Sequence, residues 1–263
     1  MSDMPRHPEV STMELNKITR SVRRRVARVA AAAMVVGAAT VSLVGSADAA
    51  TAYCYGAKVT ILGTPGNDKL LGSFGPDVIS GLGGDDLIYG RDGNDIICGD
   101  AGADTIYGSY GDDKIGGGPG NDKLYGSSGN DKLYGAGEND VLWGGDGNDR
   151  VEGGDGNDHS RSWGRDELHG DAGNDVLGGS AGNDFLFGGL GNDWHFAYAG
   201  DDLLADGSGD DYFSGNVGND DLNAVDSSPS PVNADYVSGY AGFDHCAVDA
   251  YDTSYGTVTG CDF

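Results

Sequence analysis

Aspartate recurs along this chain at a spacing that suits cation binding. Between Leu62 and Leu222 the sequence divides into 18 units, 17 of nine residues and one of eight, with the pattern X-G-x-x-G-N-D-x-L. Every unit has Asp at position seven: Asp68, Asp77, Asp86, Asp95, Asp104, Asp113, Asp122, Asp131, Asp140, Asp149, Asp158, Asp166, Asp175, Asp184, Asp193, Asp202, Asp211 and Asp220. Carboxylates in such a register repel one another unless a cation neutralises them. Oxygen ligands of variable geometry suit calcium better than magnesium.

Short strands joined by tight turns must position these carboxylates. Position five is Gly in all units except the one with Glu138, and Gly permits backbone conformations that are closed to other residues. Position nine is apolar in 16 units, with Ser160 and His195 as the exceptions. Side chains alternate along a strand, so we expect position nine to point inward and its neighbours outward. One unit buries a single side chain, whereas stacked units share a continuous core, as in a solenoid.

These units resemble the RTX (repeat-in-toxin) calcium-binding nonapeptide. Residues Gly153-Gly154-Asp155-Gly156-Asn157-Asp158 match the turn half of its pattern without a departure. The resemblance covers Leu62 to Leu222 and implies an all-β fold, a right-handed parallel β-roll (β-solenoid) with two units per coil. It also implies multiple Ca²⁺ ions between stacked turns, held by the position-seven Asp and by turn carbonyls. The caps resemble those of secreted actinobacterial proteins of this kind, with one Cys before the first unit and another near the C-terminus.

Residues 1–49 have the pattern of an export signal. A basic segment with five Arg precedes Val29 to Val44, an uncharged run of 16 residues, and Ala47-Asp48-Ala49 has the form of a cleavage site. The alternative is a retained membrane anchor, which is disfavoured because the run is short for a membrane span. We therefore expect a cleaved signal peptide and a protein that is secreted, extracellular or associated with the cell surface.

The remaining chain is strongly acidic. It contains 9 Lys and Arg residues against 38 Asp and Glu residues, a net charge of −29. This charge disfavours nucleic acid and anionic membrane surfaces as partners, because both are also negative. The carboxylate rows oppose compaction, so we expect calcium binding to decide whether the chain folds.

We expect the repeats to lie between short caps. Residues 50–61 are predicted to form an N-terminal cap that supplies a first strand, and residues 62–222 the roll. Residues 223–263 are predicted to contain a loop, a degenerate unit with Asp244 in place, and a C-terminal cap. Export would place the cysteines in an oxidising compartment, where three pairings of Cys54, Cys98, Cys246 and Cys261 are conceivable. Proximity in sequence favours Cys246–Cys261, which leaves Cys54–Cys98 and requires the N-terminal segment to lie along the roll.

Two irregular segments of the repeats are candidate functional sites. The eight-residue unit, Arg161 to Leu168, lies between His159 and His169, and is interpreted as a bulge in preference to a separate metal site. The G-x-S-x-G match at Gly178 to Gly182 lies inside a repeat and is interpreted as a by-product of the glycine register, because a nucleophile elbow needs a following helix. His195 is expected to be a tolerated core or surface residue. The sequence thus favours a calcium-binding structural or interaction module without enzyme activity. The alternative is a secreted hydrolase or a cell-surface adhesin that carries such a scaffold.

Residues 18 apart should stack on one face when each coil contains two units. Position one then aligns Leu71, Tyr89, Tyr107, Tyr125 and Trp143 in an outward row. Lys114, Lys132 and Arg150 form a second row at position eight, which we expect beside the first. A ladder that stiffens the sheet is the favoured interpretation. A binding surface for a glycan or a protein partner is the other.

Overall fold

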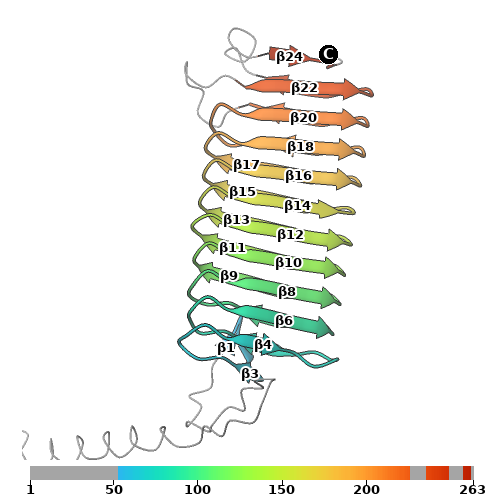
Figure 1. Cartoon of the computed structure of the whole chain (residues 1–263). Coiled ribbons are helices and arrows are strands. Elements are labelled where there is room, and N and C mark those ends of the chain that lie inside the picture. Colours follow the sequence, from blue (N-terminus) through green and yellow to red (C-terminus); the bar gives the residue numbers. More distant parts are fainter. Residues whose placement is uncertain (1–52, 226–234, 249–256, 262–263) are drawn as a thin grey trace, which may run out of the picture. The chain divides into compact units, whose positions relative to one another are not determined.

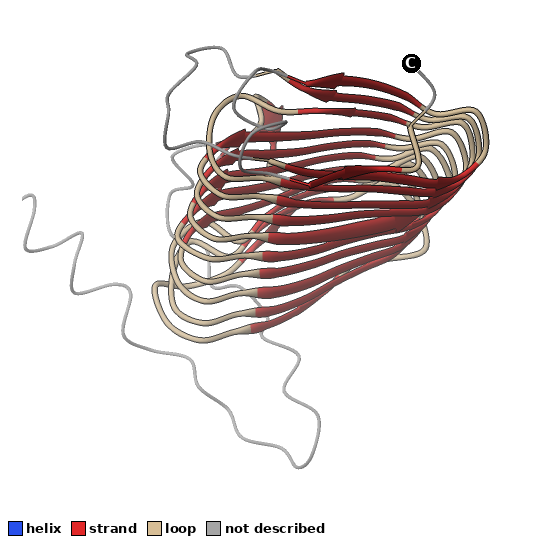
Figure 2. Cartoon of the chain, turned by 90° about the horizontal axis from the view of Figure 1, so that it is seen from above, coloured by secondary structure: helices blue, strands red, loops and turns tan. Residues whose placement is uncertain are grey.

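The chain forms two stacked parallel sheets that face each other across a narrow core. The computed structural model describes residues 53–225, 235–248 and 257–261, and these contain strands and turns but no helix. Two 11-stranded parallel sheets alternate along the chain, so that each coil contributes one strand to each sheet (Figure 1). Figure 2 looks down the stack and shows the two strand layers joined by turns at both ends. The prediction of an all-β parallel solenoid is confirmed, and the architecture is consistent with a β-roll.

Strand numbers give the sheet to which each strand belongs. The even sheet contains β4 (Lys69–Leu71), β6 (Leu87–Asp92), β8 (Thr105–Tyr110), β10 (Lys123–Ser128), β12 (Val141–Asp146), β14 (His159–Trp163), β16 (Val176–Ala181), β18 (Trp194–Ala199), β20 (Tyr212–Val217), β22 (Tyr236–Ala241) and β24 (Thr257–Thr259). The odd sheet contains β3 (Ile61–Leu62), β5 (Val78–Ser80), β7 (Ile96–Cys98), β9 (Lys114–Pro119), β11 (Lys132–Gly137), β13 (Arg150–Asp155), β15 (Glu167–Ala172), β17 (Phe185–Leu190), β19 (Leu203–Ala205), β21 (Asp221–Ala224) and β23 (His245–Val248).

Position nine fills the core as the repeat pattern predicts. Leu124 pairs with Leu142 on the next strand of the even sheet, and both side chains are fully buried. Leu133 and Val151 make the equivalent buried pair in the odd sheet. Burying one such side chain contributes about 1.5–3 kcal/mol, so a coil with two of them depends on its neighbours for stability.

Both ends of the roll extend the same two sheets. At the N-terminal end, Ile61 pairs with Ile79 and supplies the expected first strand. At the C-terminal end, strands β22, β23 and β24 continue the stack beyond Leu222. The predicted signal peptide lies outside the described residues, as does most of the loop predicted after Asn223. No helix within the described residues is long and apolar enough to cross a membrane.

A disulfide lies at each end of the stack, with the pairings that sequence proximity favours. Cys54 is bonded to Cys98 with a Cα–Cα distance of 5.9 Å, and Cys246 to Cys261 with a distance of 5.8 Å. Cys54 belongs to an antiparallel hairpin of β1 (Tyr53–Cys54) and β2 (Ala57–Lys58). The next residue, Tyr55, packs on the outer face of the odd sheet, with the Lys114 Nζ 3.7 Å from its ring centroid. The N-terminal segment therefore lies along the roll, as the Cys54–Cys98 pairing requires.

The eight-residue unit is absorbed by a local irregularity in the even sheet. Between β12 and β14 the register shifts after Trp143, and Asp146 pairs with Trp163. The odd sheet keeps its register across the same coil, with Val151 opposite Leu168. The interpretation of this region as a bulge is therefore confirmed.

The aromatic row is present, but its predicted cationic neighbours are not beside it. The ring centroids of Tyr89, Tyr107 and Tyr125 follow one another at 5.0 and 4.6 Å along the outer face of the even sheet. Lys114 and Lys132 are on β9 and β11, which belong to the odd sheet. The expectation of adjacent rows was wrong, because successive units alternate between sheets and these two rows come from opposite members of each pair.

Candidate metal centres

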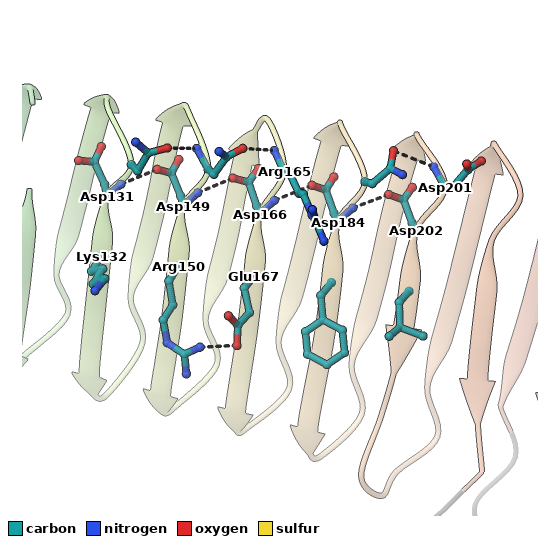
Figure 3. Close-up of a pocket in the computed structure, with 15 residues that line it drawn as sticks. Asp131, Lys132, Asp149, Arg150, Arg165, Asp166, Glu167, Asp184, Asp201 and Asp202 are labelled. Carbon is teal, nitrogen blue, oxygen red and sulfur yellow. Dashed lines mark hydrogen bonds and ion pairs between the residues drawn. The ribbon is translucent and has the colours of Figure 1, made fainter. Parts of the chain in front are cut away.

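The position-seven aspartates form two unbroken columns, one before each sheet. In both columns the Oδ1 atom of each Asp accepts the backbone N–H of the Asp one coil earlier, as in Asp122 N to Asp140 Oδ1 at 2.8 Å. Position six makes a second ladder in the opposite direction, as in Asn139 N to Asn121 Oδ1 at 3.0 Å. Figure 3 shows both ladders along the odd sheet, from Asp131 to Asp202. The two residue types that define the turn thus hold each coil to both of its neighbours.

The second carboxylate oxygen of most of these residues is buried without a hydrogen-bond partner. Within the described residues this holds for the Oδ2 atoms of Asp86, Asp95, Asp104, Asp113, Asp122, Asp131, Asp140, Asp158, Asp166, Asp175, Asp184, Asp193, Asp202, Asp211, Asp220 and Asp244. Buried polar atoms of folded proteins almost always have a partner. A regular series of unpartnered carboxylate oxygens therefore indicates a ligand that the protein atoms do not supply.

Burial makes the charged form of these carboxylates costly. Desolvation, more than any other cause, raises the pKa of Asp122 and Asp131 to about 7 and that of Asp140 to about 8. Neighbouring carboxylates raise these pKa values further, whereas the hydrogen bond from the preceding coil lowers them. Near neutral pH the roll therefore needs either protons or cations in its turns.

Most of the unpartnered oxygens lie in small cradles, each beside a position-two glycine. A Cβ built on Gly126 would collide with the Asp131 Oδ2 and with the carbonyl oxygen of Gly144 on the next coil. Gly135 has the same surroundings, formed by Asp140 and Gly153. The glycine at position two has no space for a side chain in these two cradles. Carboxylate and carbonyl oxygens together are the donor set that a hard cation such as Ca²⁺ prefers, so the residues fit that ion.

Three of the 18 predicted ligands already have hydrogen bonds to Oδ2. The Asp68 Oδ2 accepts hydrogen bonds from the backbone N–H and the hydroxyl of Thr64, at 2.6 and 2.8 Å. Asp77 accepts a hydrogen bond from the Ser73 backbone at 2.6 Å, and Asp149 one from the Ser162 hydroxyl, also at 2.6 Å. The two turns of the first coil and the single turn that contains Asp149 therefore satisfy their carboxylates internally. The other 15 predicted residues do not.

The aspartate columns continue beyond the predicted set. Asp211 N donates to the Asp235 Oδ1 and Asp220 N to the Asp244 Oδ1, at 2.8 and 3.0 Å, although each pair is 24 residues apart in sequence. Asp244 stands in the degenerate unit recognised from the sequence, and its Oδ2 is also unpartnered. The insertion after Ala224 broke the nine-residue period, so these two residues were missed as candidate ligands.

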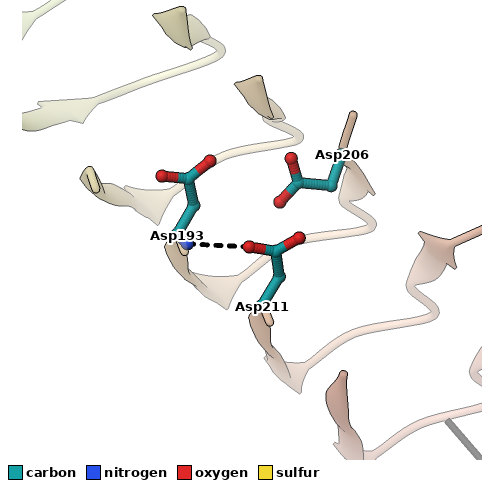
Figure 4. A group of neighbouring side chains, drawn as sticks. All are labelled: Asp193, Asp206 and Asp211. Carbon is teal, nitrogen blue, oxygen red and sulfur yellow. Dashed lines mark hydrogen bonds between the residues drawn. The ribbon is translucent and has the colours of Figure 1, made fainter. Parts of the chain in front are cut away.

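One cluster departs from the repeated arrangement. Carboxylate oxygens of Asp193, Asp206 and Asp211 all lie within 4.8 Å of one another (Figure 4). Asp206 was not predicted as a ligand, although it is the one charged residue at position two, which is otherwise Gly, Ser or Ala. The Nε2 atom of His195 lies 3.6 Å from the Asp206 Oδ2. His195 is fully buried, so of the two places that the sequence allowed, it occupies the core.

The histidines beside the eight-residue unit do not form a metal site within the described residues. His159 is exposed, and the Nε2 of His169 lies 2.9 Å from a carboxylate oxygen of Glu167 on the same strand. Among the described residues, neither histidine belongs to a group of ligands close enough to hold an ion. An open groove of about 980 Å³ runs over the turn side of the odd sheet and contains the Arg150–Glu167 ion pair (Figure 3). This groove is the outer surface of one aspartate column.

The G-x-S-x-G match has the surroundings of an ordinary repeat. Ser180 lies within β16, is largely buried, and accepts a hydrogen bond from the Arg161 Nε at 3.0 Å. The next element is the strand β17, whereas a nucleophile elbow is followed by a helix. The interpretation of this motif as a by-product of the glycine register agrees with this context.

Comparison with known protein families gives a match over the repeats. The family model described as the RTX calcium-binding nonapeptide repeat (4 copies) matches residues 62–97, 89–124, 125–159, 162–194 and 196–224. These segments cover more than half of the chain and coincide with the repeats that form the two aspartate columns. No curated protein matches the sequence.

Proposed function

Because the chain belongs to the RTX calcium-binding nonapeptide repeat family, we propose that it is a secreted, extracellular scaffold whose roll folds when its aspartate columns take up Ca²⁺. The observation that carries this proposal is the series of buried Oδ2 atoms without a partner, most of which lie beside a position-two glycine. RTX rolls in general are non-catalytic calcium-binding modules.

Each part of the turn has a separate task in this proposal. The Oδ1 atoms set the register, because they accept backbone N–H groups from the preceding coil. The Oδ2 atoms and the neighbouring turn carbonyls would hold the ions, and position-two glycines such as Gly126 keep the space open. When bound, calcium supplies the positive charge that the buried carboxylates need. About 16 divalent ions would bring roughly +32 against the −29 of residues 50–263.

Calcium binding and folding are coupled in this arrangement. The cradles are assembled from residues 18 apart in sequence, so they do not exist in the unfolded chain. Binding free energy is then available as folding free energy. Millimolar extracellular calcium would complete the roll, whereas low intracellular calcium would leave the chain extended and suited to export.

Circular dichroism of the full chain tests the coupling. We expect a coil-like spectrum in EDTA and a β spectrum after calcium addition, with Mg²⁺ as the matched control that does not restore the β signal. A complete β spectrum in EDTA that calcium leaves unchanged would contradict the proposal. Export is tested separately by expressing the chain with and without residues 1–49 and measuring its amount in the medium.

A second candidate function is an interaction surface on the even sheet, for a glycan or a protein partner. It is supported by the continuous stack of Tyr89, Tyr107, Tyr125 and Trp143, whose last ring is 42% exposed. Replacing Tyr107 and Tyr125 by Thr should remove binding to isolated cell envelope and leave calcium-dependent folding intact. If folding is lost and envelope binding is absent in the parent chain, the row is structural.

A further inference from the structure

One cradle contains donors that the others do not have. A Cβ built on Gly188 would approach the Asp193 Oδ2, the Asp206 Oδ2 at 2.7 Å and the His195 Nε2 at 2.8 Å. In the cradles of Gly126 and Gly135 the equivalent neighbours are an Asp Oδ2 and a carbonyl oxygen. We use the name Gly188 site for the side chains of Asp193, His195, Asp206 and Asp211.

Asp206 is held so that one oxygen faces this site. Its Oδ1 accepts the backbone N–H groups of Gly189 and Gly207, at 2.9 and 2.6 Å. Its Oδ2 is buried and has no hydrogen-bond partner. Asp193 and Asp211 are constrained in the same way, because their Oδ1 atoms accept the backbone N–H groups of Asp175 and Asp193, each at 2.8 Å, while both Oδ2 atoms remain unpartnered (Figure 4).

His195 completes the Gly188 site from the opposite sheet. It points into the core from β18, whereas Asp206 directly follows β19. Its ring stacks on Phe213, with centroids 4.7 Å apart and an interplanar angle of 16°, which fixes the ring orientation. The Nε2 atom is buried without a hydrogen-bond partner, and its 3.6 Å separation from Asp206 is too long for a hydrogen bond.

We propose that Asp193, His195, Asp206 and Asp211 bind a divalent transition-metal ion, with zinc as the best fit, in place of calcium at this one cradle. The carboxylate oxygens of the three aspartates lie within 4.8 Å of one another, and the unpartnered His195 Nε2 lies 3.6 Å from the Asp206 Oδ2. Imidazole suits zinc and its neighbours in the transition series, whereas calcium takes oxygen ligands. Structural zinc ions are four-coordinate, and His nitrogen and Asp oxygen are both among the ligands that zinc takes. Three clustered carboxylates also need a positive charge between them.

Two substitutions that restore the repeat pattern test this proposal without damaging the roll. His195→Leu returns an apolar residue to position nine, and Asp206→Gly returns glycine to position two. His245→Leu is the matched control, since His245 is exposed and contacts Asp221 outside the Gly188 site. The full chain, saturated with calcium, is titrated with Zn²⁺ and its metal content is measured after gel filtration. Co²⁺ serves as a spectroscopic probe of nitrogen coordination.

The expected result is about one zinc per chain, retained in excess calcium. His195→Leu and Asp206→Gly should each weaken zinc binding by roughly tenfold or more, with the calcium-induced β spectrum preserved. The control should bind zinc like the parent chain. Absence of bound zinc would overturn the proposal and leave a proton shared by Asp206 and Asp211 as the explanation of the cluster. Equal zinc binding by the parent and His195→Leu would also overturn it. Neither result affects the calcium proposal, which is measured by folding in EDTA and calcium.

Discussion

The coils from β8 to β12 and those from β14 to β20 use the same turn but different cores. In the first stretch the core positions are all Leu or Ile, whereas the second contains Ser160, His195 and Phe213. Both keep an unbroken Asp ladder, with Asp104 N to Asp122 Oδ1 at 2.7 Å and Asp158 N to Asp175 Oδ1 also at 2.7 Å. The coil register is therefore held by the aspartates and the backbone, and it tolerates exceptions in the core.

Exceptions at position two, in contrast to those in the core, change the surroundings of the aspartates. Glycine there leaves the neighbouring Oδ2 free in the regular coils, as at Asp131 and Asp140. Where Ser162 occupies position two, its hydroxyl donates to the Asp149 Oδ2 at 2.6 Å. Where Asp206 occupies it, an acidic cluster forms with Asp193 and Asp211. A substitution at this position thus changes what a turn can bind while the strands remain in place.

Removing calcium and changing the pH should alter folding more than any single substitution. Burial raises the pKa of Asp122 and Asp131 to about 7 and that of Asp140 to about 8, above the value of about 4 expected for Asp in an unfolded chain. A group whose folded pKa is raised stabilises the fold below its unfolded pKa and loses that contribution as pH rises through the folded value. The calcium-depleted chain should therefore gain β signal in circular dichroism between pH 8 and pH 5. Loss of β signal on acidification would contradict this account.

Leu142→Ala should cause the largest loss of stability among the single changes. Leu142 is fully buried between Leu124 and Ser160 in the even sheet. The cavity and the lost burial should cost about 2–5 kcal/mol, measured by urea unfolding at fixed calcium. Ser160→Ala at the adjacent core position is the matched control and should cost much less, because the Ser160 hydroxyl has no partner.

Asp140→Asn and Asp149→Asn should separate the two kinds of turn. Both keep an oxygen that can accept the backbone N–H of the preceding coil. The Asp140 Oδ2 is unpartnered, whereas the Asp149 Oδ2 accepts the Ser162 hydroxyl. We expect a several-fold higher calcium midpoint for Asp140→Asn and a smaller shift for Asp149→Asn, measured by calcium-dependent circular dichroism. Equal shifts would mean that Ser162 does not substitute for a cation.

Ser160→Leu should make the irregular core resemble the regular one. The serine hydroxyl is buried without a partner, between Leu142 and Leu177 of the neighbouring strands. An apolar side chain there should stabilise the roll by about 1–3 kcal/mol in urea unfolding at saturating calcium. A loss of stability would indicate that the shortened coil has no space for leucine.

Tyr107→Thr should have the smallest effect. Tyr107 stacks on Tyr89 and Tyr125 but lies on the outer face of the sheet, so its loss removes ring contacts and little core. We expect a cost of about 0.5–1.5 kcal/mol in the same unfolding measurement. Tyr110→Thr is the control, because Tyr110 is 66% exposed and should change stability less.

Two units per coil, and with them two aspartate columns, were implied by the resemblance to the RTX nonapeptide. The repeat spacing by itself was sufficient to predict the solenoid, the inward position nine and the stacking of the 18 aspartates in rows. These features follow from residue types within nine positions: glycine for the turn, aspartate for its carboxylate and one apolar residue per strand. The two disulfides are the pairing that proximity of Cys246 and Cys261 in the sequence favoured, although the sequence left all three pairings open.

Contacts between different units were decided by the tertiary structure. Spacing placed Lys114 and Tyr107 in rows but could not place the rows on opposite sheets, because that depends on how successive units alternate across the roll. The spacing placed Asp140 in a column of stacked aspartates. It could not show that the Asp140 Oδ1 accepts a backbone N–H of the preceding coil while the Oδ2 faces the cradle beside Gly135 without a partner. His195 and Asp206 are 11 residues apart and meet only because the chain crosses from one sheet to the other between them. A nine-residue period defines the position of a side chain within its unit, whereas the path of the turns determines which units face each other.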